Sequence, residues 1–254
     1  NILLQMLSGN RNIENPNNIT RIGDSCTGCG VCEKVCPFDS IKFTENKEGF
    51  LYPIINSETC RNCGICLSNC HLTKNKRENV DMGDYGYARN EHLRSEGSSG
   101  GAFSAIIETL SKKYSDLWIF GSVFDSINGT VHQAGFRYPD YKKLCQSKYV
   151  FSAPYNTFEE VKEFVEKGAF VVYCGTPCQI GGLKSYLKTE YNNLLLLDFI
   201  CHGVPAEKLM REHMACIGKN RQINSLEFRS KAMGWGLHKH CLKAVDSNGK
   251  IVYL

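Results

Sequence analysis

Apolar and polar residues are patterned differently on the two sides of residue 84. Before it, the apolar runs are short, and residues 41–44 and 50–54 predict two short strands around a turn at Glu48-Gly49. After it, longer apolar runs alternate with amphipathic segments, which is typical of an α/β domain. The pattern therefore predicts a small module followed by a larger domain of different architecture.

In the larger domain, β-hairpin turns are predicted at Asn128-Gly129 and Asn248-Gly249, because Asn-Gly adopts the tight turns that join paired strands. A Gly/Ser-rich turn at 98–101 precedes an amphipathic helix that reaches residue 110. The last segment is rich in predicted strands. The other predicted elements are strands at 84–90, 117–124, 130–138, 169–174 and 194–200, and helices at 158–168, at 180–188 and after Pro205.

These patterns predict four regions along the chain. Residues 1–20 are rich in Asn and predict a disordered lead-in, and residues 74–84 have the composition of a linker. They border a cysteine-rich module at 21–73 and the larger domain at 85–254. The sequence does not begin with Met and stops inside a predicted strand at 252–254, so we expect a longer polypeptide, truncated here at its C-terminus.

The cysteine-rich module contains two runs with the same C-x2-C-x2-C-x3-C spacing. In two-cluster bacterial ferredoxins, the fourth cysteine of each such run ligates the other cluster. The spacing therefore predicts two [4Fe-4S] clusters with crossed ligands. One cluster would take Cys26, Cys29, Cys32 and Cys70, and the other would take Cys60, Cys63, Cys66 and Cys36.

A pair of structural zinc sites is the alternative, because a single C-x2-C suits zinc equally well. Two identical runs, the first closed by Pro37, favour the iron–sulfur interpretation. The second run ends in Cys-His at Cys70-His71 rather than the usual Cys-Pro, which leaves the predicted ligand set intact.

Composition limits the cellular compartments and the classes of binding partner that we expect for this chain. The chain has 14 cysteines, but eight follow a cluster pattern and no secretion signal precedes them, so a reducing cytoplasm is predicted. The formal charge of +4 indicates neither a nucleic-acid nor a polybasic membrane partner. No run approaches the ~20 apolar residues that a membrane helix needs.

Three junctions of the larger domain carry small polar residues at a helix start: 98–101, 175–179 and 201–205. Such loops often bind anions, because the N–H groups of a helix N-terminus are unpaired. A cofactor with a pyrophosphate, such as FAD, would suit them, whereas ordinary turns are the alternative. None of them matches G-x-G-x-x-G, so a dinucleotide fold of that type is not predicted.

The motifs after the linker resemble those of the coenzyme F-420 hydrogenase/dehydrogenase beta-subunit family. They span most of residues 85–240 and occur in order: Ser98-Ser99-Gly100-Gly101, Ser147-Lys148-Tyr149, Gly175-Thr176-Pro177-Cys178-Gln179, Cys201-His202-Gly203-Val204-Pro205 and Phe228-Arg229-Ser230-Lys231. The resemblance implies a ferredoxin-like α+β iron–sulfur module followed by an α/β flavin-binding domain. It implies an iron–sulfur flavin oxidoreductase that passes electrons between the two clusters and FAD, with hydride transfer to or from an organic acceptor, either the deazaflavin F-420 or another small molecule. It also implies a redox partner protein or hydrogenase/dehydrogenase subunits.

The resemblance and the helix-start chemistry give candidate flavin residues. Lys148 would stabilise a reduced, anionic flavin or bind the pyrophosphate, and the alternative is a solvated lysine after a strand. His202 would donate a proton to substrate, and the alternative is a polar loop contact. Thr176 and Gln179 would bind the cofactor or simply cap their helix. The candidate cofactor-binding residues are Ser99, Gly100, Gly101, Lys148, Gly175, Thr176 and Gln179.

The family also implies a third [4Fe-4S] cluster, with Cys178 and Cys201 among its ligands and a later C-x2-C pair completing it beyond residue 254. One alternative is that this chain lacks that cluster. The other is that Cys178 and Cys201 are buried, inert thiols. The remaining cysteines, Cys145, Cys174, Cys216 and Cys241, are interpreted as packing residues.

The chain is therefore predicted to be an iron–sulfur flavoprotein oxidoreductase. The alternative from another class is a non-catalytic ferredoxin-type electron carrier that docks a partner oxidoreductase and binds no flavin. A zinc-stabilised interaction module is the third hypothesis.

Overall fold

The computed structural model describes residues 16–74, 86–218, 222–234, 239 and 241–253. The predicted lead-in therefore falls mostly outside the described residues, as does nearly all of the predicted linker. Within the described part, ordered structure begins before residue 21. The Asn18 side chain accepts a hydrogen bond from the Thr20 N–H at the start of η1 (Ile19–Ser25), and Ile19 is buried in the core of the cysteine module.

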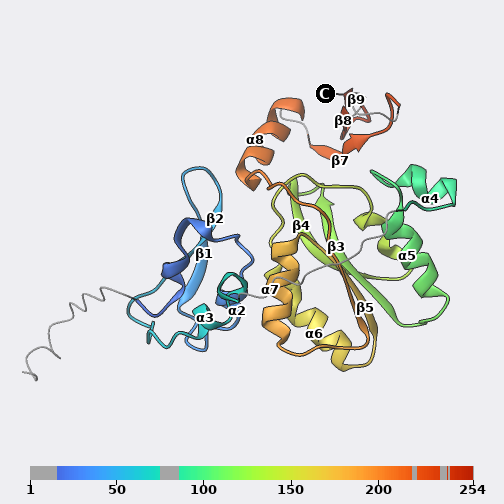
Figure 1. Cartoon of the computed structure of the whole chain (residues 1–254). Helices are drawn as coiled ribbons and strands as arrows, with labels where there is room; N and C mark the ends of the chain where they lie inside the picture. The colour runs from blue at the N-terminus through green and yellow to red at the C-terminus, as the bar shows by residue number, and fades with distance from the viewer. Residues whose placement is uncertain (1–15, 75–85, 219–221, 235–238, 240, 254) are drawn as a thin grey trace, which may run out of the picture.

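The cysteine module is a two-stranded sheet with short helices (Figure 1). Strands β1 (Ile41–Glu45) and β2 (Leu51–Ile55) pair antiparallel, as the sequence predicts. Each cysteine run forms one turn of helix, which is α2 (Val31–Lys34) in the first and α3 (Ile65–Ser68) in the second. The second run continues into η2 (His71–Thr73).

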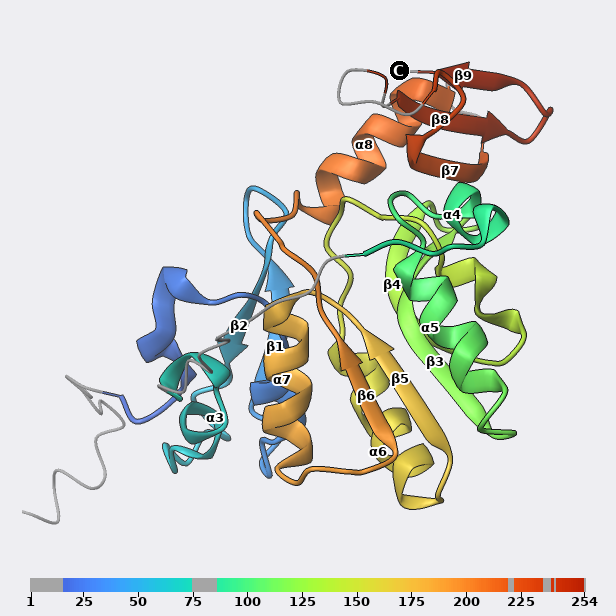
Figure 2. The ribbon, with the colours of Figure 1, turned by 45° about the vertical axis from the view of Figure 1, so that its right-hand side comes forward.

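The following domain is built on a four-stranded sheet of order β4-β3-β5-β6. The parallel strands are β3 (Leu117–Asp125), β5 (Phe170–Cys174) and β6 (Leu194–Leu197), and β4 (Thr130–Arg137) pairs antiparallel with β3 across the predicted hairpin. Helix α5 (Ala102–Ser111) covers one face of the sheet, and α6 (Phe158–Glu166) and α7 (Pro177–Leu187) cover the other (Figure 2). Two short 3-10 helices, η3 (Asp140–Leu144) and η4 (Tyr155–Thr157), lie between β4 and α6.

Alternation along β5 explains the two-sided core. Val171 and Tyr173 pack with α6 and α7, whereas Val172 packs with Ile107 of α5 on the opposite face. Successive side chains of a strand point to opposite faces, so a continuous apolar run fits a strand covered on both sides.

The C-terminal part forms a separate layer. Helix α8 (Glu207–Gly218) precedes a three-stranded antiparallel sheet of β7 (Ile223–Ser230), β8 (Cys241–Asp246) and β9 (Ile251–Tyr253). The predicted turn at 248–249 joins β8 to β9. Met210 and Met214 of α8 pack against this sheet and against Val131 of β4.

The strand predicted at 84–90 is wrong for residues 86–90, the part that the structure describes. Asn90 instead begins α4 (Glu91–Glu96), because its side chain accepts hydrogen bonds from the His92 and Leu93 N–H groups. Asn competes well for such capping positions, and that local preference outweighs the strand pattern before it.

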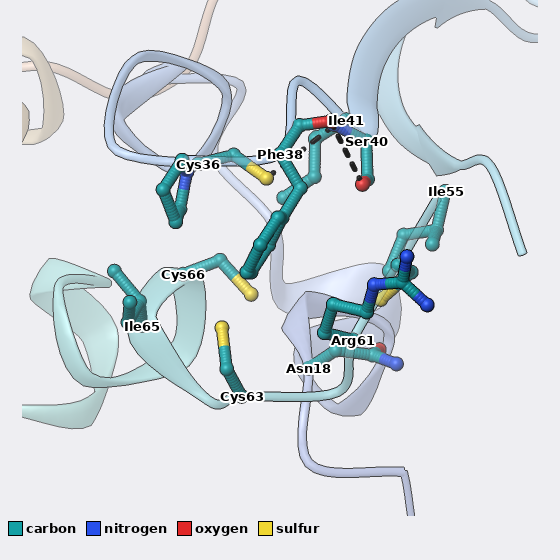
Figure 3. A pocket seen from close by; sticks show the side chains of 12 residues that line it. Asn18, Cys36, Phe38, Ser40, Ile41, Ile55, Arg61, Cys63, Ile65 and Cys66 are labelled. Atoms are coloured by element: carbon teal, nitrogen blue, oxygen red, sulfur yellow. Dashed lines mark hydrogen bonds between the residues drawn. The ribbon is translucent and has the colours of Figure 1, made fainter. Parts of the chain in front are cut away.

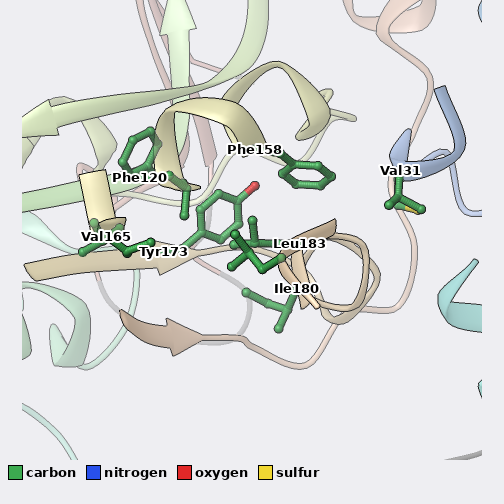
Figure 4. Close-up of a cluster of buried hydrophobic side chains, with 11 residues drawn as sticks. Val31, Phe120, Phe158, Val165, Tyr173, Ile180 and Leu183 are labelled. Carbon is green, nitrogen blue, oxygen red and sulfur yellow. The ribbon is translucent and has the colours of Figure 1, made fainter. Parts of the chain in front are cut away.

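The module and the larger domain share one hydrophobic core. Val31 of α2 and Cys29 belong to the same buried cluster as Phe158 of α6 and Leu183 of α7 (Figure 4). Both ribbon views show the module on the side of α7 that faces away from α5. Within the part of the chain that the structure describes, no helix is both long and apolar enough to cross a membrane.

Candidate iron–sulfur and cofactor sites

The first predicted set of thiols converges across the two runs. Burial raises the pKa of the Cys32 thiol, and the neighbouring thiols of Cys29 and Cys26 from its own run and of Cys66 and Cys70 from the other raise it further. Burial raises the pKa of the Cys29 thiol to about 12, with a smaller contribution from Cys70. An apolar site of this kind disfavours bare thiolates, so a bound cation would have to supply the compensating charge.

The second predicted set lines a pocket (Figure 3). Cys36 from the first run faces Cys63 and Cys66 from the second, and Cys60 also lines the pocket. Its walls are largely apolar, with Phe38, Ile41, Ile55 and Ile65. Each group therefore contains thiols from both runs, and the assignment of the eight cysteines to two crossed sets stays a prediction.

The cysteine sulfurs of this pocket, and the N–H groups that donate to them, fit a cubane cluster. Backbone N–H groups point at two of its sulfurs, from Ser40 to Cys36 Sγ at 3.4 Å and from Asn62 to Cys60 Sγ at 3.5 Å. Hydrogen bonds of this kind help to set the reduction potential of iron–sulfur clusters. Among the described residues, no three Cys, His, Asp or Glu side chains are close enough to share one metal ion. A cubane, with one thiolate on each iron, does not require that.

The two predicted strand-to-helix junctions of the sheet lie side by side. The Gly175 N–H donates to the carbonyl of Leu197 at 3.0 Å, which joins the loop after β5 to the end of β6. A side chain at Gly175 would place its Cβ 2.8 Å from the Gln179 Oε1 atom. Glycine is therefore required here by close packing.

Thr176 and Gln179 form a capping box at the start of α7. The Gln179 Oε1 atom accepts from the Thr176 N–H at 2.8 Å, and the Gln179 Nε2 group donates to the carbonyl of Ser152 at 2.8 Å. Both side chains are buried. In the structure these two side chains therefore cap helix α7, which was the alternative to cofactor binding.

The Gly/Ser-rich turn opens α5 as the sequence predicts. Gly101 has φ +75°, and a Cβ there would lie 2.7 Å from the carbonyl oxygen of Leu93. The hydroxyl of buried Ser98 accepts a hydrogen bond from the Ser147 N–H at 2.8 Å. Ser99 is exposed and Gly100 is half-buried beside it.

A connecting segment, residues 145–155, joins these turns, and we call it the strap. Its Ser147 contacts the turn before α5, as described above. The Phe151 N–H donates to the carbonyl of Pro205 at 3.1 Å, and Ser152 accepts from Gln179. The strap therefore holds all three predicted helix starts together, a role that no sequence motif indicated.

Lys148 of the strap provides a half-buried cation. Its Nζ group donates to the carbonyls of Cys145 at 2.6 Å and Lys143 at 3.3 Å. Burial lowers the pKa of Lys148 to about 8, and the nearby thiols of Cys145 and Cys174 partly oppose that shift. A lysine beside two glycine-containing helix starts fits a pyrophosphate-bearing cofactor.

The structure separates the other candidates. His202 is exposed, and Cys201 Sγ accepts from the Gly203 N–H at 3.4 Å within the same loop. Cys178 Sγ lies 3.1 Å from the Thr176 hydroxyl and within electrostatic range of Cys29.

Sequence reasoning missed a buried amide in the same region. The Gln133 Nε2 group of β4 donates to the Ser122 hydroxyl at 3.0 Å and to the Ser152 hydroxyl at 3.3 Å. Among the described residues, its Oε1 atom is one of two buried side-chain N or O atoms that lack a hydrogen-bond partner. In the sequence, Gln133 looks like any other polar residue of a strand with alternating polar and apolar positions, so nothing indicated that it would be buried.

Comparison with known proteins defines the class of the first module. Residues 25–73 match the 4Fe-4S dicluster domain. The chain is also 36% identical over 47 residues to an uncharacterized ferredoxin of Methanocaldococcus jannaschii, a match that covers 18% of this chain and 60% of that protein. The module is therefore of the 4Fe-4S ferredoxin type.

A second relative is similar over a longer part of the chain. The chain is 25% identical over 215 residues to the coenzyme F420-dependent sulfite reductase of Methanocaldococcus jannaschii, which covers 81% of this chain and 33% of that enzyme. The chain thus spans about a third of the length of this relative. A solved F420-reducing [NiFe] hydrogenase complex from Methanosarcina barkeri matches with a TM-score of 0.45 and 12% identity, over 66% of this chain and 58% of that one. The resemblance to F420-related iron–sulfur proteins is confirmed.

Proposed function

We propose that this chain is an iron–sulfur flavoprotein oxidoreductase, or the electron-transferring part of one. It carries two [4Fe-4S] clusters in the cysteine module and FAD in the α/β domain. It exchanges electrons with a small organic acceptor, F420 or another molecule, and works with a redox partner or with hydrogenase or dehydrogenase subunits in a reducing cytoplasm. The observation that carries the proposal is the shared core of the two domains, which places Cys29 against helix α7.

In this proposal, the cysteines hold iron in the two crossed sets described above. Apolar side chains around the cysteines keep water away from both clusters. Lys148 and the start of α5 bind the pyrophosphate, with Ser99, Gly100 and Gly101 supplying N–H or hydroxyl donors. Thr176 and Gln179 position α7, and Gly175 allows the chain to pass closely over them. When bound, FAD supplies the exchange between one-electron and two-electron chemistry. His202 remains the candidate proton donor, and a third cluster at Cys178 and Cys201 remains a proposal.

A ferredoxin-type electron carrier without flavin is the second candidate. The capping box favours it, because the side chains of Thr176 and Gln179 already have partners within the protein. The two candidates share the clusters and differ in FAD content alone.

The test is an anaerobic count of iron, sulfide and flavin, with the ultraviolet–visible spectrum, on both the full-length polypeptide and this chain. We expect about eight irons per chain, as two cubanes require, and one FAD. Iron without flavin in the full-length protein would leave the electron carrier. Colourless protein that contains zinc would overturn both.

The affinity for FAD should fall as the pH rises through about 8, because Lys148 loses its proton near that pH in the free protein. A bound diphosphate raises the pKa of this lysine, so above pH 8 each further unit should weaken binding by up to about tenfold. Equilibrium titration of iron-loaded, flavin-free protein between pH 7 and 9 measures the effect.

Two variants check that this lysine is responsible. Lys148→Met should bind FAD weakly at pH 7 and show a flat profile, whereas Lys143→Met, which changes an exposed lysine nearby, should keep the wild-type profile. A wild-type profile in Lys148→Met would remove Lys148 from the cofactor site.

A further inference from the structure

The two cysteine sets differ in what covers them. In the inner set, Cys29, Cys32 and Cys70 are 7%, 3% and 5% exposed. The fourth thiol of the inner set, Cys26, is half-buried. In the outer set, Cys63 is exposed and Cys66 is buried, and the other two thiols are half-buried. The inner set consists of Cys26, Cys29, Cys32 and Cys70, and the outer set of Cys36, Cys60, Cys63 and Cys66.

Helix α7 covers the inner set at unusually short range. A Cβ added at Gly182 would lie 3.0 Å from Cys29 Cβ and 3.3 Å from its Sγ. The backbone of α7 therefore packs directly on an inner cysteine, and Cys178 at the start of the same helix is within electrostatic range of Cys29. Glycine inside a helix is less stable than alanine, so the helix alone does not favour Gly182.

The strap covers the same set from a second side. The ring of Phe151 lies 3.1 Å from a Cβ built at Gly28, and the ring of Tyr155 overlaps the position of a Cβ at Gly30. Both glycines lie between cysteines of the inner set. Because the strap also holds Lys148 and the three helix starts, it runs from the candidate cofactor site to the inner set.

The outer set has no such cover in the described structure. Every residue that lines its pocket comes from the cysteine module, between Asn18 and Cys66. Phe38 and Ile65 at its rim are 43% and 37% exposed. Among the described residues, this pocket is therefore lined by the module alone and reaches solvent at Phe38 and Ile65.

We propose that the two clusters act in a fixed spatial order. The inner set would hold its cluster against α7 and the strap, where it would supply one-electron exchange with the α/β domain. The outer set would hold its cluster in a pocket lined by the module alone, where it would supply one-electron exchange with a redox protein. In each exchange the donor would lose the one electron that the acceptor gains, with no bond formed and no proton moved. The inference rests on the proposed function and adds the order of the clusters and the place where the partner donates or accepts.

The test measures how closely a paramagnetic chelate dissolved in water can approach each cluster. The reduced, iron-loaded protein is examined by electron paramagnetic resonance with a water-soluble dysprosium chelate, which speeds the relaxation of nearby spins. Cys29→Ser and Cys63→Ser assign the two signals. We expect the outer signal to respond at least about tenfold more strongly than the inner one, since exposure differs between the two sites.

Two substitutions then test the cover itself. Tyr155→Ala should make the inner signal respond to the chelate, and Phe38→Ala, the matched change at the outer pocket, should leave the inner signal unchanged. Should Tyr155→Ala fail to fold, Gly182→Ala presses a methyl group on Cys29 and should shift only the inner signal. It should also slow electron exchange between that cluster and FAD, while reduction of the outer cluster by dithionite is unchanged.

The outcomes separate the two proposals. Equal responses in the wild-type protein, or an outer signal that shifts in Gly182→Ala, would overturn the order of the clusters and leave the oxidoreductase proposal standing. Protein without iron would overturn both.

Discussion

Alanine at Cys29 and alanine at Cys70 are expected to remove the same cluster, although these cysteines lie in different runs. The reason is the crossed grouping of the thiols, in which Cys70 lies beside Cys26 and Cys29. Each variant should fall from about eight irons per chain to about four, because a cubane that loses one of its four thiolates is poorly held. Iron analysis and electron paramagnetic resonance should show the same missing signal in both.

Cys36→Ala and Cys63→Ala form the complementary pair and should remove the other cluster, because both thiols line the outer pocket. Cys145→Ala is the matched control, since it removes a half-buried thiol outside the module and should leave all iron in place. If Cys29→Ala and Cys36→Ala lost the same signal, each run would hold its own cluster and the crossed assignment would be wrong.

The cysteine module was predictable because its information is local. The spacing of eight cysteines restricts the ligand geometry, and the 4Fe-4S dicluster domain matches the same residues, 25–73. The hairpins at 128–129 and 248–249 were predictable for the same reason, since Asn-Gly has few alternatives between two apolar runs.

The interface between the domains was not predictable, because its contacts join residues far apart in sequence. Gly182 gives no local signal, yet it lies against Cys29 across 153 positions of sequence (182 minus 29). The strap likewise contains no motif beyond Ser147-Lys148-Tyr149, and its importance lies in partners from four separate segments. Thr176 and Gln179 show a further limit, because the sequence alone left open whether they cap a helix or bind a cofactor.

Gly30→Ala is expected to destabilise the protein far more than Gly64→Ala, although the two glycines occupy equivalent positions in the two runs. Both are left-handed helix caps, with φ +74° at Gly30 and +79° at Gly64. Alanine in that conformation costs about 1–2 kcal/mol at either site. The two positions differ in what the new methyl group meets.

At Gly30 the added Cβ would lie 1.8 Å from the ring of Tyr155, whereas at Gly64 it would meet the side-chain amide of Asn17 at 2.6 Å. Asn17 is exposed and can move aside, but Tyr155 is packed against Phe43 with ring centroids 5.5 Å apart. Overpacking a rigid contact adds about 1–3 kcal/mol, so Gly30→Ala should lose about 2–5 kcal/mol in total. Anaerobic urea unfolding of the iron-loaded protein, followed by cluster absorbance, measures the difference.

The double variant Gly30→Ala/Tyr155→Ala identifies the cause, because removing the ring leaves only the backbone strain at residue 30. Its loss of stability should be smaller than the sum of the two single losses by about 1–3 kcal/mol, the share assigned to the clash. Additive losses, or equal losses at Gly30 and Gly64, would mean that Tyr155 does not press on the inner cysteine loop. The seal that the strap is inferred to form over the inner cluster would then lose its main contact.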